Sequence, residues 1–294
     1  MKIFIAGGTG FVGGHVVREL SGRGCRVRLL VHRRGASFEG VEQIEGDVTC
    51  PESLEQGVDG CAAVVNLVGI IREFPAKGTT FERLHVQATA NLLAAAKKAG
   101  IRRYVQMSAL GTRPNAVSRY HKTKFRAEEL VRNSGLKWTI LRPSLIFGPQ
   151  DAFVTMFARQ LRLAPVLPVI GSGAYRLQPI HVRDVARCFA LALEMPETIG
   201  QCYELCGDDR LTYADMLDAI AAAMGRSAPL KPRLPLGVMK LVIPVMEGIP
   251  QFPITMDQLQ MLVEESICDG RWKETFGFAP KGFREGIAEY LTGS

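Results

Sequence analysis

The chain has 294 residues, of which 47% are hydrophobic and 22% charged, a balance that is ordinary for a globular protein and excludes a disordered chain. Its net charge of +7 comes from scattered pairs of Lys and Arg without a basic stripe and interleaved aromatics, so nucleic-acid binding is not expected. The chain has no uninterrupted run of about 18 apolar residues, and we therefore expect no membrane span.

Short apolar segments alternate with segments of helical periodicity in the first half of the chain. The expected strands cover residues 2–6, 25–31, 41–45, 62–68, 101–107 and 138–141, and the expected helices cover 11–20, 51–57, 80–99 and 119–131. Such alternation is typical of βαβ units. It predicts an α/β fold, with a Rossmann-type, doubly wound parallel sheet.

The alternation of expected strands and helices ends after Pro149. Proline and glycine interrupt the next residues, and helices are expected at 184–194, at 213–224 and near the C-terminus. We interpret residues 1–149 as a dinucleotide-binding domain. Residues 150–294 would form a smaller, mostly helical substrate lobe that interleaves with it without a clean linker.

An apolar segment at 234–254 stands out in this lobe. It is interrupted by Lys240, Pro244 and Glu247, so it cannot cross a bilayer. It predicts an apolar substrate pocket or a membrane-facing surface, and ordinary core packing of the lobe is the alternative.

The seven cysteines are scattered along the chain. None forms a C-x-x-C pair or a cluster with His at zinc-ligand spacing, so no metal site is expected. Cys202 and Cys206 are the nearest pair, and we interpret them as strand residues rather than disulfide partners. Together with a first strand that runs directly into a glycine-rich turn, with no signal peptide, this favours a reducing, cytoplasmic location.

The glycine-rich turn lies between the first expected strand and the first expected helix. Gly7, Gly10 and Gly13 form the pattern G-x-x-G-x-x-G. Glycines permit a tight turn, close approach of the backbone to a pyrophosphate, and close packing of helix on strand. The free N–H groups of the helix N-terminus then favour the anion. This arrangement predicts a nicotinamide dinucleotide site.

The residues after the second expected strand indicate which dinucleotide is preferred. An acidic residue there would hold the ribose 2′-hydroxyl of NAD, but this chain has His32, Arg33 and Arg34. Guanidinium groups pair with a 2′-phosphate. The sequence therefore favours NADP(H) over NAD(H), unless both arginines simply point into water.

A tyrosine and a lysine follow the fifth expected strand. Tyr120 and Lys124 are four residues apart on an expected helix, so their side chains share a face. A neighbouring cation favours the phenolate and is expected to lower the pKa of the tyrosine. Such a pair can move a proton at a carbonyl or alcohol while the nicotinamide exchanges a hydride.

With these motifs the chain resembles the extended, atypical short-chain dehydrogenase/reductases of the NAD-dependent epimerase/dehydratase kind. The resemblance also rests on Leu141-Arg142-Pro143-Ser144 and on the segment 179–186. It implies that Gly7, Thr9, Gly10, Phe11 and Val12 line the pyrophosphate, that His32, Arg33 and Arg34 surround the adenosine ribose, and that Asp47 and Val48 contact the adenine. It further implies that Leu67, Val68 and Gly69 lie over the cofactor ribose, that Lys124 also holds the nicotinamide ribose, and that Pro143 lies near the nicotinamide.

Within this family the chain resembles most the NAD(P)-binding accessory subunit of respiratory complex I and its bacterial relatives. Residues 66–69, 108–111 and 255–259 carry that likeness. Ser108 is the candidate for the family's catalytic serine, or a polar residue that ends a strand. His85 stands where the family has a relay asparagine, and it would join a relay or serve as a hydrogen-bonded helix histidine.

Two functions remain open from the sequence. The first is an NADP(H)-dependent oxidoreductase, epimerase or dehydratase that acts on a small, lipophilic carbonyl or hydroxyl substrate through Tyr120 and Lys124. The second is a non-catalytic NADPH-binding assembly or stability module. The resemblance also implies peripheral association with a membrane or a respiratory complex.

Overall fold

The computed structural model describes residues 1–32, 38–249, 252 and 254–292. The chain divides into two compact units. The first comprises Met1–Pro143 and Arg183–Glu204, and the second comprises Ser144–Val182 and Leu205–Ser294. The first unit thus includes a segment that the expected ranges of 1–149 and 150–294 assign to the smaller lobe.

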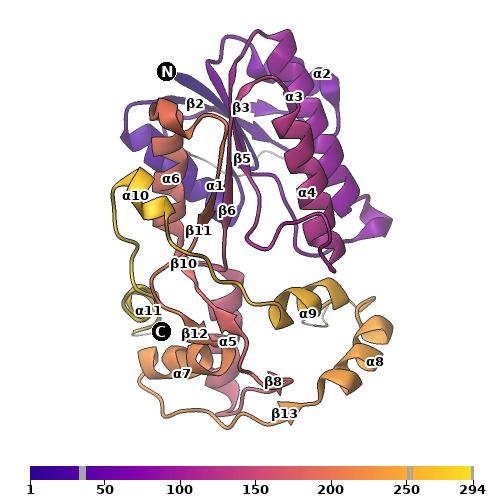
Figure 1. Ribbon diagram of the computed structural model, residues 1–294, viewed down its shortest axis with the longest axis vertical. Helices are drawn as coiled ribbons and strands as arrows, with labels where there is room; N and C mark the ends of the chain where they lie inside the picture. The colour runs from indigo at the N-terminus through magenta and orange to yellow at the C-terminus, as the bar shows by residue number, and fades with distance from the viewer. Residues whose placement is uncertain (33–37, 250–251, 253, 293–294) are drawn as a thin grey trace. The chain divides into compact units, whose positions relative to one another are not determined.

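A seven-stranded sheet forms the centre of the first unit (Figure 1). Its strands are β1 (Lys2–Ala6), β2 (Arg26–Val31), β3 (Glu42–Glu45), β4 (Ala63–Asn66), β5 (Arg103–Met107), β6 (Lys137–Pro143) and β11 (Gln201–Leu205). Their order is β11-β6-β5-β4-β1-β2-β3, and β1 to β6 pair in parallel. Successive strands are added on one side of β1 up to β3 and on its other side from β4 onward, so the switch point of this Rossmann sheet lies between β1 and β4, which confirms the predicted fold class.

Helices cover both faces of this sheet. Figure 1 shows α2, α3 and α4 on one face and α1 and α6 on the other. Their bounds are α1 (Phe11–Gly22), α2 (Pro51–Val58), α3 (Ala88–Lys98), α4 (Arg119–Arg132) and α6 (Val182–Glu194), with short 3-10 turns at Pro75–Lys77 and Pro196–Thr198. Strands β1 and β4 are buried because they lie between the two helical layers.

The long helix expected at 80–99 is not continuous. Residues Glu82–Gln87 form a π-helix that leads into α3, and the N–H of Ala88 donates to the carbonyl of Arg83, five residues earlier. The hydroxyl of Thr89 donates to the carbonyl of His85 at 2.6 Å. The backbone hydrogen bond across five residues that defines a π-helix is uncommon and often occurs near functional sites.

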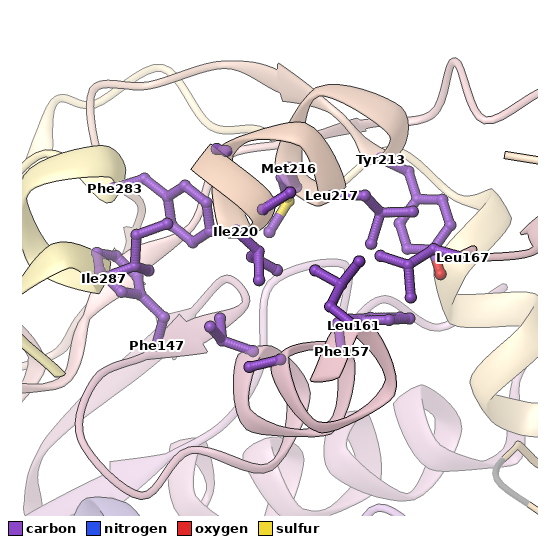
Figure 2. Close-up of a cluster of buried hydrophobic side chains, with 14 of the residues drawn as sticks. Phe147, Phe157, Leu161, Leu167, Tyr213, Met216, Leu217, Ile220, Phe283 and Ile287 are labelled. Carbon is purple, nitrogen blue, oxygen red and sulfur yellow. The ribbon is translucent and has the colours of Figure 1, made fainter. Parts of the chain in front are cut away.

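The second unit has a core of its own, built largely from three helices (Figure 2). These are α5 (Ala152–Leu163), α7 (Tyr213–Ala223) and α11 (Phe283–Leu291). The sequence did not predict α5, although Asp151 is a good N-cap, and its carboxylate accepts the Val154 N–H at 2.6 Å. The labelled core side chains in Figure 2 are Phe147, Phe157, Leu161, Leu167, Tyr213, Met216, Leu217, Ile220, Phe283 and Ile287.

Short strands and helices complete the second unit. The strands pair as β7 (Ile146–Phe147) with β10 (Ile180–His181), β8 (Val169–Ile170) with β13 (Arg233–Leu234), and β9 (Arg176–Leu177) with β12 (Leu211–Thr212). The remaining helices are α8 (Leu236–Met246), α9 (Met256–Val263) and α10 (Trp272–Phe276). Among the described residues, no helix is both long enough and apolar enough to cross a membrane.

One expectation about the cysteines is wrong. Cys206 follows β11 instead of lying in it, and it forms a disulfide with Cys268, which is 62 residues away. The backbone around the bridge is held by side chains, because Trp272 Nε1 donates to the Cys206 carbonyl and the Cys268 N–H donates to Gln178 Oε1, both at 3.0 Å. Cys202 lies in β11 as expected and is unbridged.

Candidate functional site

The glycine-rich turn joins β1 to α1 and leaves room for nothing larger than glycine at its tightest point. A Cβ on Gly13 would lie 2.2 Å from the carbonyl oxygen of Gly7, which itself has φ of +82°. Gly10 caps α1 in an extended conformation without a side-chain hydrogen bond, and Thr9 and Gly10 are exposed. The first turn of α1 carries no acidic residue. An exposed helix N-terminus without a carboxylate in its first turn suits a pyrophosphate.

Two of the residues expected around the adenosine lie at the ends of β2 and β3. His32 is exposed, and its Nδ1 lies 3.7 Å from Asp47 Oδ2. Burial acts to raise the pKa of Asp47, but hydrogen bonds from the N–H and hydroxyl of Thr49, at 2.7 and 2.8 Å, outweigh it and lower that pKa. Val48 packs against the core of the first unit. Arg33 and Arg34 lie outside the described residues.

Asn66 fixes the segment that follows β4. The sequence motifs included it in the family likeness of residues 66–69 but gave it no role in the site. Its Oδ1 accepts the Val68 N–H at 3.0 Å, while its Nδ2 donates to Gln106 Oε1 at 3.0 Å and to Thr89 Oγ1 at 3.2 Å. An asparagine at the end of an otherwise apolar, fully buried strand was the available signal. These bonds hold Leu67, Val68 and Gly69 in place at the carboxyl edge of the sheet.

Lys124 extends from α4 toward this segment. Its Nζ lies 3.4 Å from the Val68 carbonyl oxygen and 3.3 Å from that of Met107, and the residue is only 2% exposed. A Cβ on Gly69 would lie 2.9 Å from the same nitrogen. Burial lowers the pKa of Lys124 to about 8, although the charge of Glu128 acts in the opposite direction.

Tyr120 lies one helical turn before Lys124 and is surrounded by aromatic rings. Its ring meets Phe81 edge-on at a centroid distance of 5.8 Å and His85 at 5.3 Å. Burial raises the pKa of Tyr120 to about 12. The expected lowering of this pKa is therefore wrong, because burial makes the charged phenolate costly.

His85 projects from the π-helix and is neutral. Its Nδ1 lies 2.9 Å from Thr123 Oγ1, and its Nε2 lies 3.3 Å from the Ile70 N–H nitrogen. The same Nε2 lies 3.2 Å from the Ile70 carbonyl oxygen. The Thr123 hydroxyl also lies 2.9 Å from the Tyr120 carbonyl oxygen, so His85 links Thr123 to the Ile70 backbone in either tautomer. Burial, and then the charge of Lys124, lower the pKa of His85 to about 2.

The family of the chain follows from a comparison with known proteins. A profile described as the NAD dependent epimerase/dehydratase family matches residues 3–206. The chain belongs to this family. The resemblance that the sequence motifs indicated is thereby confirmed.

Two relatives and one solved structure show what the chain is similar to. The mitochondrial NADH dehydrogenase [ubiquinone] 1 alpha subcomplex subunit 9 of Arabidopsis thaliana is 30% identical over 80% of this chain, which spans only 61% of that relative. The ceramide reductase of Caulobacter vibrioides is 31% identical over 79% of this chain and 72% of the relative. The UDP-glucose 4-epimerase of Thermus thermophilus, solved with NAD, is 22% identical, covers 99% of this chain and 98% of its own, and shares the fold with a TM-score of 0.76.

Ser108 directly follows β5, and Pro143 is the last residue of β6. The Ser108 N–H donates to the Leu141 carbonyl at 2.7 Å, and its buried hydroxyl lies 3.4 Å from Thr112 Oγ1. The Pro143 carbonyl accepts the Leu110 N–H at 2.9 Å. Both residues are therefore anchored by the backbone of neighbouring segments.

The structure brings part of the predicted site of this family member together. Tyr120, Lys124, Val68 and Gly69 lie around one point, together with His85. Thr123 belongs to the same cluster, and the sequence motifs missed it, although its place between Tyr120 and Lys124 on one helix face was visible. The exposed glycine-rich turn, the first turn of α1 without an acidic residue, and the buried ammonium of Lys124 fit the binding of a dinucleotide.

Proposed function

We propose that the protein is a nicotinamide dinucleotide-dependent oxidoreductase that reduces a carbonyl group of a small, lipophilic substrate. The observation that carries the proposal is the pair formed by Tyr120 and Lys124 beside the carboxyl edge of a Rossmann sheet, the edge at which such sheets bind ligands. The relative named ceramide reductase supports both reduction and a lipophilic substrate.

The residues of the first unit would hold the dinucleotide in the order of the chain. Gly7, Thr9, Gly10, Phe11 and Val12 would bind the pyrophosphate, and Asp47 and Val48 would contact the adenine. Leu67, Val68, Gly69 and Lys124 would face the nicotinamide ribose, with Pro143 near the nicotinamide. When bound, the dinucleotide supplies or accepts a hydride.

Tyr120 would act as a proton donor. A phenol whose pKa is raised to about 12 stays protonated at neutral pH. It is matched to an alkoxide that develops on a carbonyl oxygen, and poorly matched to removing a proton from an alcohol. At neutral pH the phenol is therefore in the protonated form that reduction of a carbonyl requires.

Lys124 would position the reacting groups. Its ammonium, held between the Val68 and Met107 carbonyls, can donate a further hydrogen bond to a ribose hydroxyl. His85, through Thr123, would hold the backbone at Tyr120 and keep its ring against the phenol. Ser108 would orient the substrate oxygen.

NADP(H) is the preferred cofactor in this proposal. The reason is His32-Arg33-Arg34 at the end of β2, where guanidinium groups would pair with the 2′-phosphate. One charge-assisted contact contributes roughly 1.5–3 kcal/mol, which is tenfold or more in affinity. Calorimetric titration of the wild type and of an Arg33→Ala, Arg34→Ala variant should show that the preference for NADPH over NADH disappears. Equal affinities in the wild type would refute the preference.

A second function has its own support. His85 replaces the relay asparagine that the family resemblance leads one to expect, and Tyr120 is only 8% exposed. One relative is named a subunit of NADH dehydrogenase. The alternative is therefore a non-catalytic NADPH-binding module that stabilises an assembly.

Tyr120→Phe separates the two functions. The substitution deletes one hydroxyl and keeps the ring, so packing against Phe81 and His85 should change little. Carbonyl reduction, measured as NADPH oxidation over a panel of lipophilic ketones and quinones, should fall about 10²–10⁴-fold while NADPH affinity is retained. Lys124→Ala serves as the comparison and should weaken both. A Tyr120→Phe protein that fully restores a deletion strain, with NADPH bound, would overturn the enzymatic proposal.

A further inference from the structure

Helix α8 of the second unit is apolar on both of its sides. Its inner side carries Leu236, Met239 and Ile243, which pack with Ile170 and Leu259 into a small separate core. The expected alternative of ordinary core packing is therefore correct for this side only. Figure 1 shows α8 at the periphery of the second unit.

The outer side of α8 consists of large apolar side chains in water. Val238, Leu241, Val242 and Val245 are 52%, 77%, 39% and 78% exposed. Their spacing of three, four and seven residues places them along one stripe of the helix. A helix that is hydrophobic all round normally lies in a protein core or in contact with lipid.

The charged residues that precede and follow this stripe in the sequence are mostly positive. Between residues 226 and 249 there are four cationic side chains, Arg226, Lys231, Arg233 and Lys240, and one carboxylate, Glu247. Lys231 is paired with Asp218, and Glu247 accepts the Met256 N–H at 2.9 Å. Lys240 is the one charged residue within α8, and it is exposed. Arg233, three residues before the helix, is exposed as well, so the helix that carries the stripe is itself cationic.

We propose that the outer stripe of α8, defined by Val238, Leu241, Val242 and Val245, docks on the surface of an anionic phospholipid membrane. Apolar side chains enter the boundary between headgroups and acyl chains, and the flanking cations contact lipid phosphates. With 11 residues the helix is roughly 16 Å long, about half the hydrocarbon thickness, so it lies in the interface. A second copy fits less well, because a symmetric contact would bring Lys240 close to its own equivalent. The proposal does not depend on the reaction at Tyr120.

Co-sedimentation of the whole protein with vesicles tests this docking. The protein should bind vesicles of equimolar phosphatidylcholine and phosphatidylglycerol, and bind phosphatidylcholine alone more weakly. A Leu241→Asp, Val245→Asp variant should lose at least about tenfold in affinity for the anionic vesicles. Val117→Asp is the matched control, since Val117 is 58% exposed in the other unit, and it should bind like the wild type.

Two further measurements test the apolar and the cationic contributions to binding separately. Val245→Trp should give a blue-shifted emission on anionic vesicles that brominated acyl chains quench, whereas Val117→Trp should not respond. Lys240→Glu with Arg233→Glu should reduce binding to anionic vesicles and leave the weak binding to phosphatidylcholine unchanged. Absence of vesicle binding, binding that survives Leu241→Asp with Val245→Asp, or a dimer in solution that those substitutions dissociate would each overturn the proposal.

Discussion

The buried ammonium of Lys124 leads to a pH dependence that can be worked out from the structure. The residue is 2% exposed, and burial lowers its pKa from 10.5 to about 8. At one pKa unit for each 1.36 kcal/mol, the charged form is disfavoured in the folded protein by about 3 kcal/mol. Below the folded pKa both states are protonated, so the group adds no slope to stability. Between about pH 8 and 10.5 the unfolded chain holds more protons, and stability rises with pH.

Replacing the lysine by methionine removes this titration and keeps much of the volume. The free energy of unfolding of the wild type minus that of Lys124→Met should therefore increase by about 2 kcal/mol between about pH 7.5 and pH 9.5. The difference between the two proteins cancels groups that titrate in both. The stability of each at a single pH decides less, because Lys124→Met also removes the hydrogen bonds that the ammonium donates to the Val68 and Met107 carbonyls.

Carbon-13 NMR of lysine Cε measures the same pKa directly. One resonance, absent in Lys124→Met, should titrate near 8, well below the 10.4 or so of an exposed lysine. NADPH affinity should fall over the same interval, since the neutral amine is a weaker partner for the ribose and phosphates. Parallel pH profiles of the two proteins, together with all lysines titrating above 10, would refute this account of the site.

Two other predictions concern the backbone. Gly13→Ala should destabilise the protein by about 1–3 kcal/mol and abolish dinucleotide binding, because the new Cβ would lie 2.2 Å from a backbone oxygen. The adjacent Gly14→Ala is the control. Its Cβ would meet only side chains at 3.5 Å or more, so it should be tolerated. If both bind NADPH normally, the turn is not as tight as described. Removing the bridge with Cys206→Ser and Cys268→Ser should cost about 4 kcal/mol under oxidising conditions, as expected for a closed loop of 62 residues, whereas Cys50→Ser at an exposed cysteine should cost little. Equal denaturation midpoints of the bridged protein with and without reductant would contradict this.

The first six strands could be predicted because they depend on local patterns. Most of these strands are short apolar runs bounded by a turn, although Glu42–Glu45 is mostly polar, and the alternation with helices leaves few topologies. The same reasoning could not assign β11, since Gln201–Leu205 is a short, partly polar segment at the edge of the sheet. Its pairing with β6 is a contact across about 60 residues of chain that no local pattern records.

Burial and long-range contacts explain the misses at the site. The four-residue spacing placed Tyr120 and Lys124 on one face, but it could not show that both would be desolvated, which reverses the expected direction of the tyrosine pKa. The π-helix that carries His85 depends on a shift of one residue in helical hydrogen bonding, and the amino-acid composition of the segment does not predict such a shift. The Cys206–Cys268 bridge was missed because proximity in sequence was taken as a guide to proximity in space.

Lys124 and Tyr120 differ in what they reveal about whether the protein is an enzyme or a module that only binds NADPH. A module that only binds NADPH needs the Lys124 ammonium, and Lys124 remains mostly charged below about pH 8. It has no need of the Tyr120 hydroxyl, because a phenylalanine would satisfy the same aromatic contacts with Phe81 and His85. Lys124 variants therefore change binding under either function, whereas the hydroxyl of Tyr120 matters only where a proton is transferred. An enzyme of this design should slow as Lys124 deprotonates near pH 8, and its rate should show no titration from His85, whose pKa lies near 2.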